Sequence, residues 1–277
     1  MVILKKSLYK PTKKLKKRVI RKFKPLGDRI FFDRYLRKDI PVLVYQMGKV
    51  ASSSVSHSLS RQYPGVVLQA HYFKPNHKDW RVRRLYHWVI ERAGSLNIIS
   101  LTREPIGRNV SVFFQNFEGQ TGVPYDKANF SLEELKTIFL EKFKNEQPLH
   151  WFDNNIMKNF GIDVYFKPFP EYGHSIYTHK NIRLLVMRSE INDSEKVKVI
   201  KDFLKMDSFQ LVNRNISAHK EYASTYMDFK RNVKFPLDYI DKMCKSKYFN
   251  HFYDQNVIDT VRRKWSGANP SDCIKSS

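Results

Sequence analysis

The chain contains little cysteine and no long apolar run. Cys244 and Cys273 are its only cysteines, and neither has a cysteine or histidine near it at the spacing of metal ligands. This excludes a disulfide framework, and we expect no bound metal. Because no run of eighteen apolar residues is present, no membrane-spanning helix is expected either. The amino-terminal segment is basic but lacks the apolar core of a secretory signal, which predicts a cytoplasmic protein.

Acidic residues are also scarce. The 277 residues include 50 lysines and arginines but 27 aspartates and glutamates, which gives a formal net charge of +23. Residues 1–38 carry 15 of the basic side chains and only two acidic ones, and we refer to them as the basic arm. Within this arm, Leu15, Val19 and Phe23 recur every four residues, which predicts a basic amphipathic helix.

A basic amphipathic helix can lie on an anionic membrane surface, which would make the protein peripheral on the inner face of the membrane. A solvated tail is the alternative interpretation of residues 1–38. Nucleic acid is the less favoured partner, because the chain has neither zinc-finger spacing nor the aromatic signature of an RNA-binding domain. If the arm were the only functional element, the protein would be a basic membrane-surface adaptor without catalytic activity.

After residue 38, apolar runs alternate with amphipathic segments along the sequence. Buried strands are expected at residues 42–45, 65–73, 96–101, 162–166 and 183–190, with helices between them and a loop at 118–129. Strands that alternate with helices predict the α/β class, with a central, mostly parallel sheet flanked by helices. Residues 39–277 are expected to form a single domain of this kind.

The first strand leads into a loop that is suited to bind an anion. Gly48 turns the chain, Lys49 follows, and the serines at 52–54 precede the next helix. The N–H groups at a helix N-terminus and the positive end of the helix dipole bind phosphate or sulfate. A plain strand-to-helix turn with serine caps is the alternative interpretation.

This loop does not match a Walker A nucleotide loop. Leu43 stands where that motif requires its first glycine, and Val50 stands where it requires the hydroxyl that binds magnesium. The rival enzyme class is a nucleotide-dependent kinase or NTPase on the same fold, and these two departures argue against it. It would also need an acidic residue at a strand end, where this chain has the basic Arg103.

Arg103 belongs to a second motif, at the end of the strand expected at 96–101. Pro105 follows in the first turn of the next helix, and Ser111 comes eight residues after Arg103. The carboxyl ends of strands are where ligands bind in open α/β sheets. Arginine suits a phosphate because its planar guanidinium meets two oxygens at once. A surface ion pair is the commoner role of a single arginine.

Both motifs resemble those of sulfotransferases. The 5′-phosphosulfate loop of that family reads Lys, any residue, Gly and two Ser or Thr, and Lys49-Val-Ala-Ser-Ser is similar, with Ala51 in place of the glycine. Its Arg-x-Pro motif is followed by a serine on the next helix, as Arg103 is here by Ser111. Residues 160–165, 184–190 and 263–266 resemble bacterial capsular polysaccharide synthesis proteins, although Arg263-Lys-Trp-Ser lacks the tyrosine of their Asn-Lys-Trp-Tyr-Ser motif.

The resemblance implies a P-loop-like three-layer fold and a sulfotransferase. Such an enzyme would move a sulfuryl group from 3′-phosphoadenosine 5′-phosphosulfate to a hydroxyl or amine of a glycan, such as a capsular or surface polysaccharide. Lys49 would be catalytic and contact the leaving phosphate, and Arg103 and Ser111 would bind the 3′-phosphate. The loop residues that would bind the 5′-phosphosulfate are Gly48, Lys49, Val50, Ala51, Ser52, Ser53 and Ser54.

The remaining site residues are histidines and their neighbours. His71 ends the second expected strand, and we predict that it is the base that takes the acceptor proton, with a structural histidine as the alternative. His150, Trp151 and Asp153 are candidates for the sugar site, although a tryptophan is more often part of the core. The basic loop 214–220 would close over the nucleotide.

Overall fold

The structure, a computed structural model, describes residues 29–212 and 221–267. Its five strands form one sheet in the order β2-β1-β3-β5-β4. The strands are β1 Val42–Tyr45, β2 Val67–Ala70, β3 Leu96–Thr102, β4 His174–His179 and β5 Ile182–Arg188. β2, β1, β3 and β5 are parallel, and β4 pairs with β5 in the antiparallel direction. The predicted α/β class with a mostly parallel sheet is confirmed.

The central strands are buried on both faces, which explains their mostly apolar sequences. Every residue of β1 and β3 is buried, as expected where helices cover both sides of a parallel sheet. β4 instead alternates, with Tyr177 buried and Ile176 exposed, as an edge strand does. The sequence analysis did not predict β4, because its polar, histidine-flanked sequence has no apolar run.

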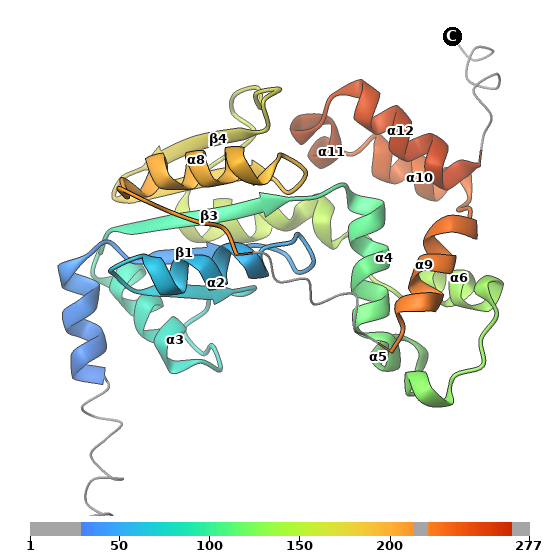
Figure 1. The fold of residues 1–277 in the computed structure, drawn as a ribbon, viewed down its shortest axis with the longest axis horizontal. Coiled ribbons are helices and arrows are strands. Elements are labelled where there is room, and N and C mark those ends of the chain that lie inside the picture. The colour runs from blue at the N-terminus through green and yellow to red at the C-terminus, as the bar shows by residue number, and fades with distance from the viewer. Residues whose placement is uncertain (1–28, 213–220, 268–277) are drawn as a thin grey trace, which may run out of the picture.

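Helices fill the connections and extend the fold beyond the sheet. Besides the helical residues 29–38, the helical segments are α2 Ser53–Gln62, α3 Trp80–Tyr86, η1 His87–Glu91, α4 Pro105–Gln115, α5 Phe117–Thr121, η2 Tyr125–Lys127, α6 Leu132–Glu141, η3 Gln147–His150, η4 Phe152–Met157, α7 Lys158–Phe160, α8 Asp193–Leu204, α9 Ala223–Asn232, α10 Leu237–Cys244, α11 Lys247–Phe252 and α12 Gln255–Ser266. Figure 1 shows α2 and α8 on one face of the sheet, and α4, α6, α9 and α10 gathered beyond the carboxyl end of β3.

Two local predictions were wrong. Residues 162–166 form no strand: Ile162 and Val164 are buried, but the Asp163 carboxylate accepts a hydrogen bond from the Tyr165 N–H at 2.8 Å, which makes a turn instead. The segment 118–129 is not loop throughout, because most of α5 lies within it. Both errors come from reading composition alone over short segments.

The strand order brings the two predicted motifs to one edge of the sheet. From β1 the chain goes to β2 on one side, whereas β3 lies on the other side of β1. The connections that follow β1 and β3 therefore lead to opposite sides of the sheet. In open α/β sheets, ligands bind at such a position, at the carboxyl ends of the strands. The loop after β1 (residues 46–52) and Arg103, directly after β3, both lie at this edge (Figure 1).

Residues 29–38 of the basic arm are helical and contact the body of the protein. Leu36 is buried, the Phe32 and Trp80 rings lie 5.3 Å apart, and Arg84 donates a hydrogen bond to Asp33 at 2.7 Å. The predicted helix around Leu15, Val19 and Phe23, and the predicted loop 214–220, lie outside the described residues. In residues 29–212 and 221–267, no helix is both long and apolar enough to cross a membrane.

Candidate functional site

The loop between β1 and α2 has a strained backbone. Lys49 and Ala51 adopt φ angles of 70° and 60°, in the left-handed region that costs a residue with a side chain about 1–2 kcal/mol. This explains why the similar sulfotransferase pattern has glycine at the position of Ala51. Strain of this kind is kept where the surrounding structure fixes the loop, and it is common at binding sites.

The N-terminus of α2 is not capped by a side chain. Ser52 occupies the N-cap position without a capping hydrogen bond, and no acidic residue lies in the first turn of α2. No acidic side chain from the first turn itself therefore neutralises the positive end of this helix. Backbone N–H groups at such an end are suited to an anionic ligand.

Arg103 contacts this loop directly. Its Nη1 donates a hydrogen bond to the Lys49 carbonyl at 3.0 Å. The backbone of Arg103 is fixed by Tyr248 of α11, whose hydroxyl accepts from the Arg103 N–H at 3.1 Å and donates to its carbonyl at 2.9 Å. The structure thus brings the two predicted motifs together. Ser111 lies two turns into α4, and its side chain is nearly buried.

Arg108 is a candidate site residue that the sequence analysis did not identify. It is 1% exposed, and it donates hydrogen bonds to the Gly48 carbonyl at 3.0 Å, to Asn109 at 3.1 Å and to Gln147 at 2.6 Å. All three acceptors are uncharged, and Arg108 forms no ion pair within residues 29–212 and 221–267. The available signal was a charged residue inside the apolar sequence of α4, between Ile106 and Val110.

Burial lowers the pKa of Arg108 to about 10, and the charge of nearby Arg103 contributes. At neutral pH the guanidinium is still protonated, so the site contains a buried positive charge without a negative partner from the described chain. A buried cation of this kind is unfavourable unless an anion compensates it. The arrangement is therefore suited to a bound anion at the Gly48–Lys49 loop.

His71 lies directly after β2 and faces the same loop. Its Nδ1 is 2.9 Å from the carbonyl oxygen of Gln46. Because a carbonyl can only accept, Nδ1 must carry the proton, and the neutral ring then has its lone pair on Nε2. This is the tautomer that a general base requires, and the side chain is exposed.

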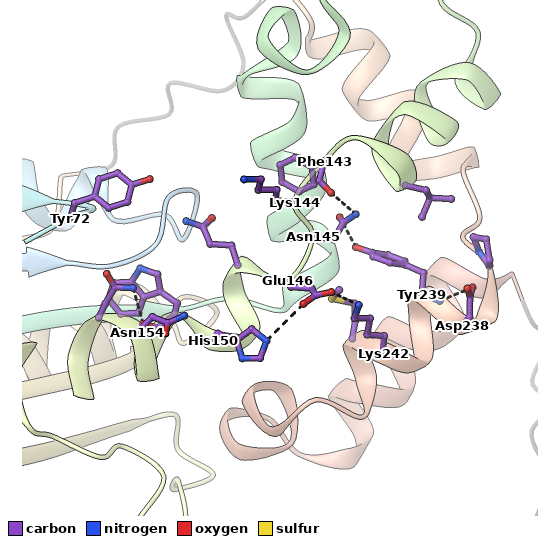
Figure 2. A pocket seen from close by; sticks show the side chains of 16 residues that line it. Tyr72, Phe143, Lys144, Asn145, Glu146, His150, Asn154, Asp238, Tyr239 and Lys242 are labelled. Atoms are coloured by element: carbon purple, nitrogen blue, oxygen red, sulfur yellow. Dashed lines mark hydrogen bonds and ion pairs between the residues drawn. The ribbon is translucent and has the colours of Figure 1, made fainter. Parts of the chain in front are cut away.

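A cleft of about 710 Å³ lies beside this site (Figure 2). It is bounded by Tyr72, which follows His71, and by residues of α6, η3, η4 and α10. His150 and Trp151, two of the predicted sugar-site residues, line it, although Trp151 is only 2% exposed and packs against Tyr45. The lining residues are Tyr72, Leu140, Phe143, Lys144, Asn145, Glu146, Gln147, His150, Trp151, Asn154, Asn155, Pro236, Asp238, Tyr239, Lys242 and Met243.

Asp153, the third predicted sugar-site residue, is not among those that line the cleft. Its carboxylate lies 3.9 Å from the Lys247 ammonium, in a partly exposed ion pair. By contrast, Gln147 lines the cleft and also accepts from Arg108. Arg108 therefore connects the loop at Gly48 with the cleft wall through two hydrogen bonds.

Residues 110–254, just over half of the chain, match the model of a protein family described as "Putative capsular polysaccharide synthesis protein" (NKWYS). The chain belongs to this family. No curated protein and no solved structure matches it. The match covers Ser111 and most of the cleft, whereas the Gly48–Lys49 loop, His71 and Arg103 precede it. Membership of the NKWYS family indicates a biosynthetic role connected with polysaccharides.

One buried group in this NKWYS protein leads to a stability prediction. The Gln46 side chain is fully buried, and neither its amide nitrogen nor its amide oxygen has a hydrogen-bond partner in the described structure. An unpaired buried polar group costs about 1–3 kcal/mol. We therefore expect Gln46→Met, which is close in volume, to raise the free energy of unfolding by about that amount in urea titrations.

The exposed Gln115 offers a matched control, because its replacement by methionine should change the free energy of unfolding by no more than about 0.5 kcal/mol. A loss of stability in Gln46→Met would mean that the Gln46 amide has a polar partner in solution. In that case Gln46 is part of the structural support of the loop.

Proposed function

We propose that this protein is a sulfotransferase that moves a sulfuryl group from 3′-phosphoadenosine 5′-phosphosulfate to a hydroxyl of a glycan. The observation that carries the proposal is the buried charge of Arg108, which has no acidic partner in the described chain and is fixed to the carbonyl of Gly48. The donor has anionic groups at both ends of its nucleotide. The family's connection with polysaccharides supports a glycan as the acceptor.

The residues present fit this donor. The uncapped N-terminus of α2 and the amides of residues 50–54 would hold the 5′-phosphosulfate, with Lys49 beside its bridging oxygen. Arg103, which contacts the Lys49 carbonyl, and Ser111 on α4 would hold the 3′-phosphate. Because charged hydrogen bonds are strong where water is excluded, the buried Arg108 would strengthen binding of either anionic group.

The chemistry requires positioning, a base and charge stabilisation. When bound, the donor supplies the sulfuryl group, whose bond to the 5′-phosphate oxygen breaks as a bond to the acceptor oxygen forms. His71 would take the hydroxyl proton on Nε2, the nitrogen left without a proton by the bond to Gln46. Lys49 would stabilise the negative charge that develops on the leaving phosphate.

The cleft beside Tyr72 would bind the acceptor. Its side-chain amides, from Asn145, Gln147, Asn154 and Asn155, can donate to and accept from sugar hydroxyls. Lys242 forms an ion pair with Glu146, which also lies 3.9 Å from His150 (Figure 2), whereas Lys144 and Asp238 form no ion pair within the described residues. A pocket with many amides and charges of both signs is suited to a polar sugar.

The proposal predicts which nucleotide the protein binds. Adenosine 3′,5′-bisphosphate at about 100 times its dissociation constant should stabilise the fold by about 2.7 kcal/mol, measured by thermal shift. Arg103→Ala should weaken this ligand about tenfold or more, since a charged hydrogen bond contributes about 1.5–3 kcal/mol. It should hardly affect adenosine 5′-monophosphate, which lacks the 3′-phosphate.

Two results would contradict this prediction. Stabilisation by ATP with magnesium but not by the bisphosphate would indicate a kinase or NTPase. Equal loss of both adenosine ligands in Arg103→Ala would mean that Arg103 does not bind the 3′-phosphate. Arg81→Ala serves as the control, because Arg81 is exposed and paired with Asp79.

A further inference from the structure

Residues 29–38 present an exposed surface that combines large apolar side chains with basic ones. Ile30, Phe31 and Tyr35 are 64%, 62% and 48% exposed. At about 100° per residue, Arg34 falls between Ile30 and Phe31 on the helix, and Arg37 lies next to Ile30. Both arginines are exposed as well. The opposite side of this helix carries Phe32 and Leu36, which pack against the body.

The neighbouring helix α3 adds further positive charge. Asp33 accepts hydrogen bonds from Arg84, and this contact, with the charges of Arg92 and Arg37, lowers the pKa of the Asp33 carboxyl. The one carboxylate of this helix is thus surrounded by guanidinium groups. Arg83 donates to the uncharged carbonyls of His77 and Lys78, so its charge is not neutralised by these contacts.

A small hollow lies where the two helices meet. It has a volume of about 190 Å³ and is lined by Arg29, Trp80, Arg83, Arg84 and His87. Arg84 is paired with Asp33, but Arg29 and Arg83 form no ion pair within the described residues, and two such guanidinium groups at one hollow are suited to a phosphate-sized anion. Arg29, which lines this hollow, directly precedes the exposed Ile30 in the same helix, so a ligand surface that reaches both would have to offer anionic groups beside an apolar layer.

We infer that the surface formed by residues 29–38 and α3 binds an anionic lipid membrane. Ile30, Phe31 and Tyr35 enter the boundary between headgroups and acyl chains, and the arginine-lined hollow holds a lipid phosphate. Amphipathic helices with aromatic and basic residues bind membranes in this way. Large exposed apolar side chains rimmed by polar ones mark interaction surfaces.

Two further observations favour a membrane over other partners. Residues 1–28 precede this surface directly in sequence and carry eleven basic side chains against Asp28 alone, and each basic residue near an anionic bilayer contributes about 1 kcal/mol. The surface also lies at the far end of the molecule from α4, α6 and α10 (Figure 1). Membrane binding would therefore leave the cleft accessible, and it does not depend on the proposed reaction.

Sedimentation of the full-length protein with lipid vesicles tests this inference. The protein should bind vesicles that contain phosphatidylglycerol and hardly bind phosphatidylcholine alone. The double variant Ile30→Ser with Phe31→Ser should lower the partition coefficient about tenfold or more. Phe166→Ser is its control, because Phe166 is 70% exposed but lies elsewhere on the fold, and it should bind as the parent does.

A charge-reversal pair tests the electrostatic part. Arg34→Glu with Arg37→Glu should reduce binding at least about tenfold at low salt, and less at high salt, where the charges are screened. The exposed residues Lys198 and Arg231, replaced by glutamate together, control for net charge and should reduce binding less.

Three outcomes would overturn the inference. The first is unchanged vesicle binding in both test variants with residues 1–28 intact, which would exclude this surface as the binding site. The second is a protein dimer that the Ile30 and Phe31 variant dissociates, which would make a second copy the partner. The third is binding to a single-stranded oligonucleotide but not to anionic vesicles.

Discussion

Replacement of Lys49 by methionine should lower kcat by about a hundredfold to a thousandfold, the usual effect of removing one group that stabilises transition-state charge. Methionine keeps the length of the side chain and the left-handed backbone of Lys49 but removes the ammonium. Because charge on the leaving phosphate develops as the sulfur–oxygen bond breaks, the affinity for the donor should change much less than kcat. Steady-state turnover of labelled donor and a separate binding titration measure the two effects.

Ala51→Gly provides the control for disturbance of the loop. Glycine adopts the observed φ of 60° without strain, so this variant should keep near-parent activity and be as stable as the parent or slightly more so. If Lys49→Met lowered donor affinity as much as kcat, Lys49 would contribute to binding in general and not to the reaction step.

The sheet could largely be predicted from sequence because its inner strands are almost entirely buried. β1, β3 and β5 are apolar runs that need neighbours on both sides, and their predicted positions agree with the structure to within a few residues. The sequence from Ser131 to Glu134 has the Ser-x-x-Glu pattern of a capping box, and both hydrogen bonds of that box are present at the start of α6. Edge strand β4 depends on its pairing with β5, which tertiary contacts decide, whereas the turn at Asp163 forms through a local hydrogen bond between its carboxylate and the Tyr165 N–H.

The site was predictable only where residues follow one another in sequence. The Gly48–Lys49 loop and Arg103 each form a local motif, and the topology brings both to one edge of the sheet. Arg108 and Gln46 became candidates only through their burial and their hydrogen bonds, which no spacing reveals. The cleft draws on segments that are far apart in sequence, from Tyr72 to Met243, so only the fold assembles it.

For His71, mutations can distinguish a role as the general base from a role in supporting the loop structure. His71→Ala should lower turnover by roughly a hundredfold or more, the usual contribution of a general base, while donor binding remains. The hydrogen bond from Nδ1 to the Gln46 carbonyl raises the alternative that His71 only supports the loop. His71→Asn distinguishes the two roles, because an asparagine amide can still donate to that carbonyl but cannot take a proton from the acceptor.

If His71 is the base, His71→Asn should be nearly as inactive as His71→Ala, and its thermal stability should match that of the parent. His150→Asn is the comparison within the cleft: His150 lines the proposed acceptor site, so this change should raise KM for the glycan more than it lowers kcat. Near-parent turnover in His71→Asn would show that the histidine is structural. A large fall in kcat in His150→Asn would then transfer the role of the base to His150.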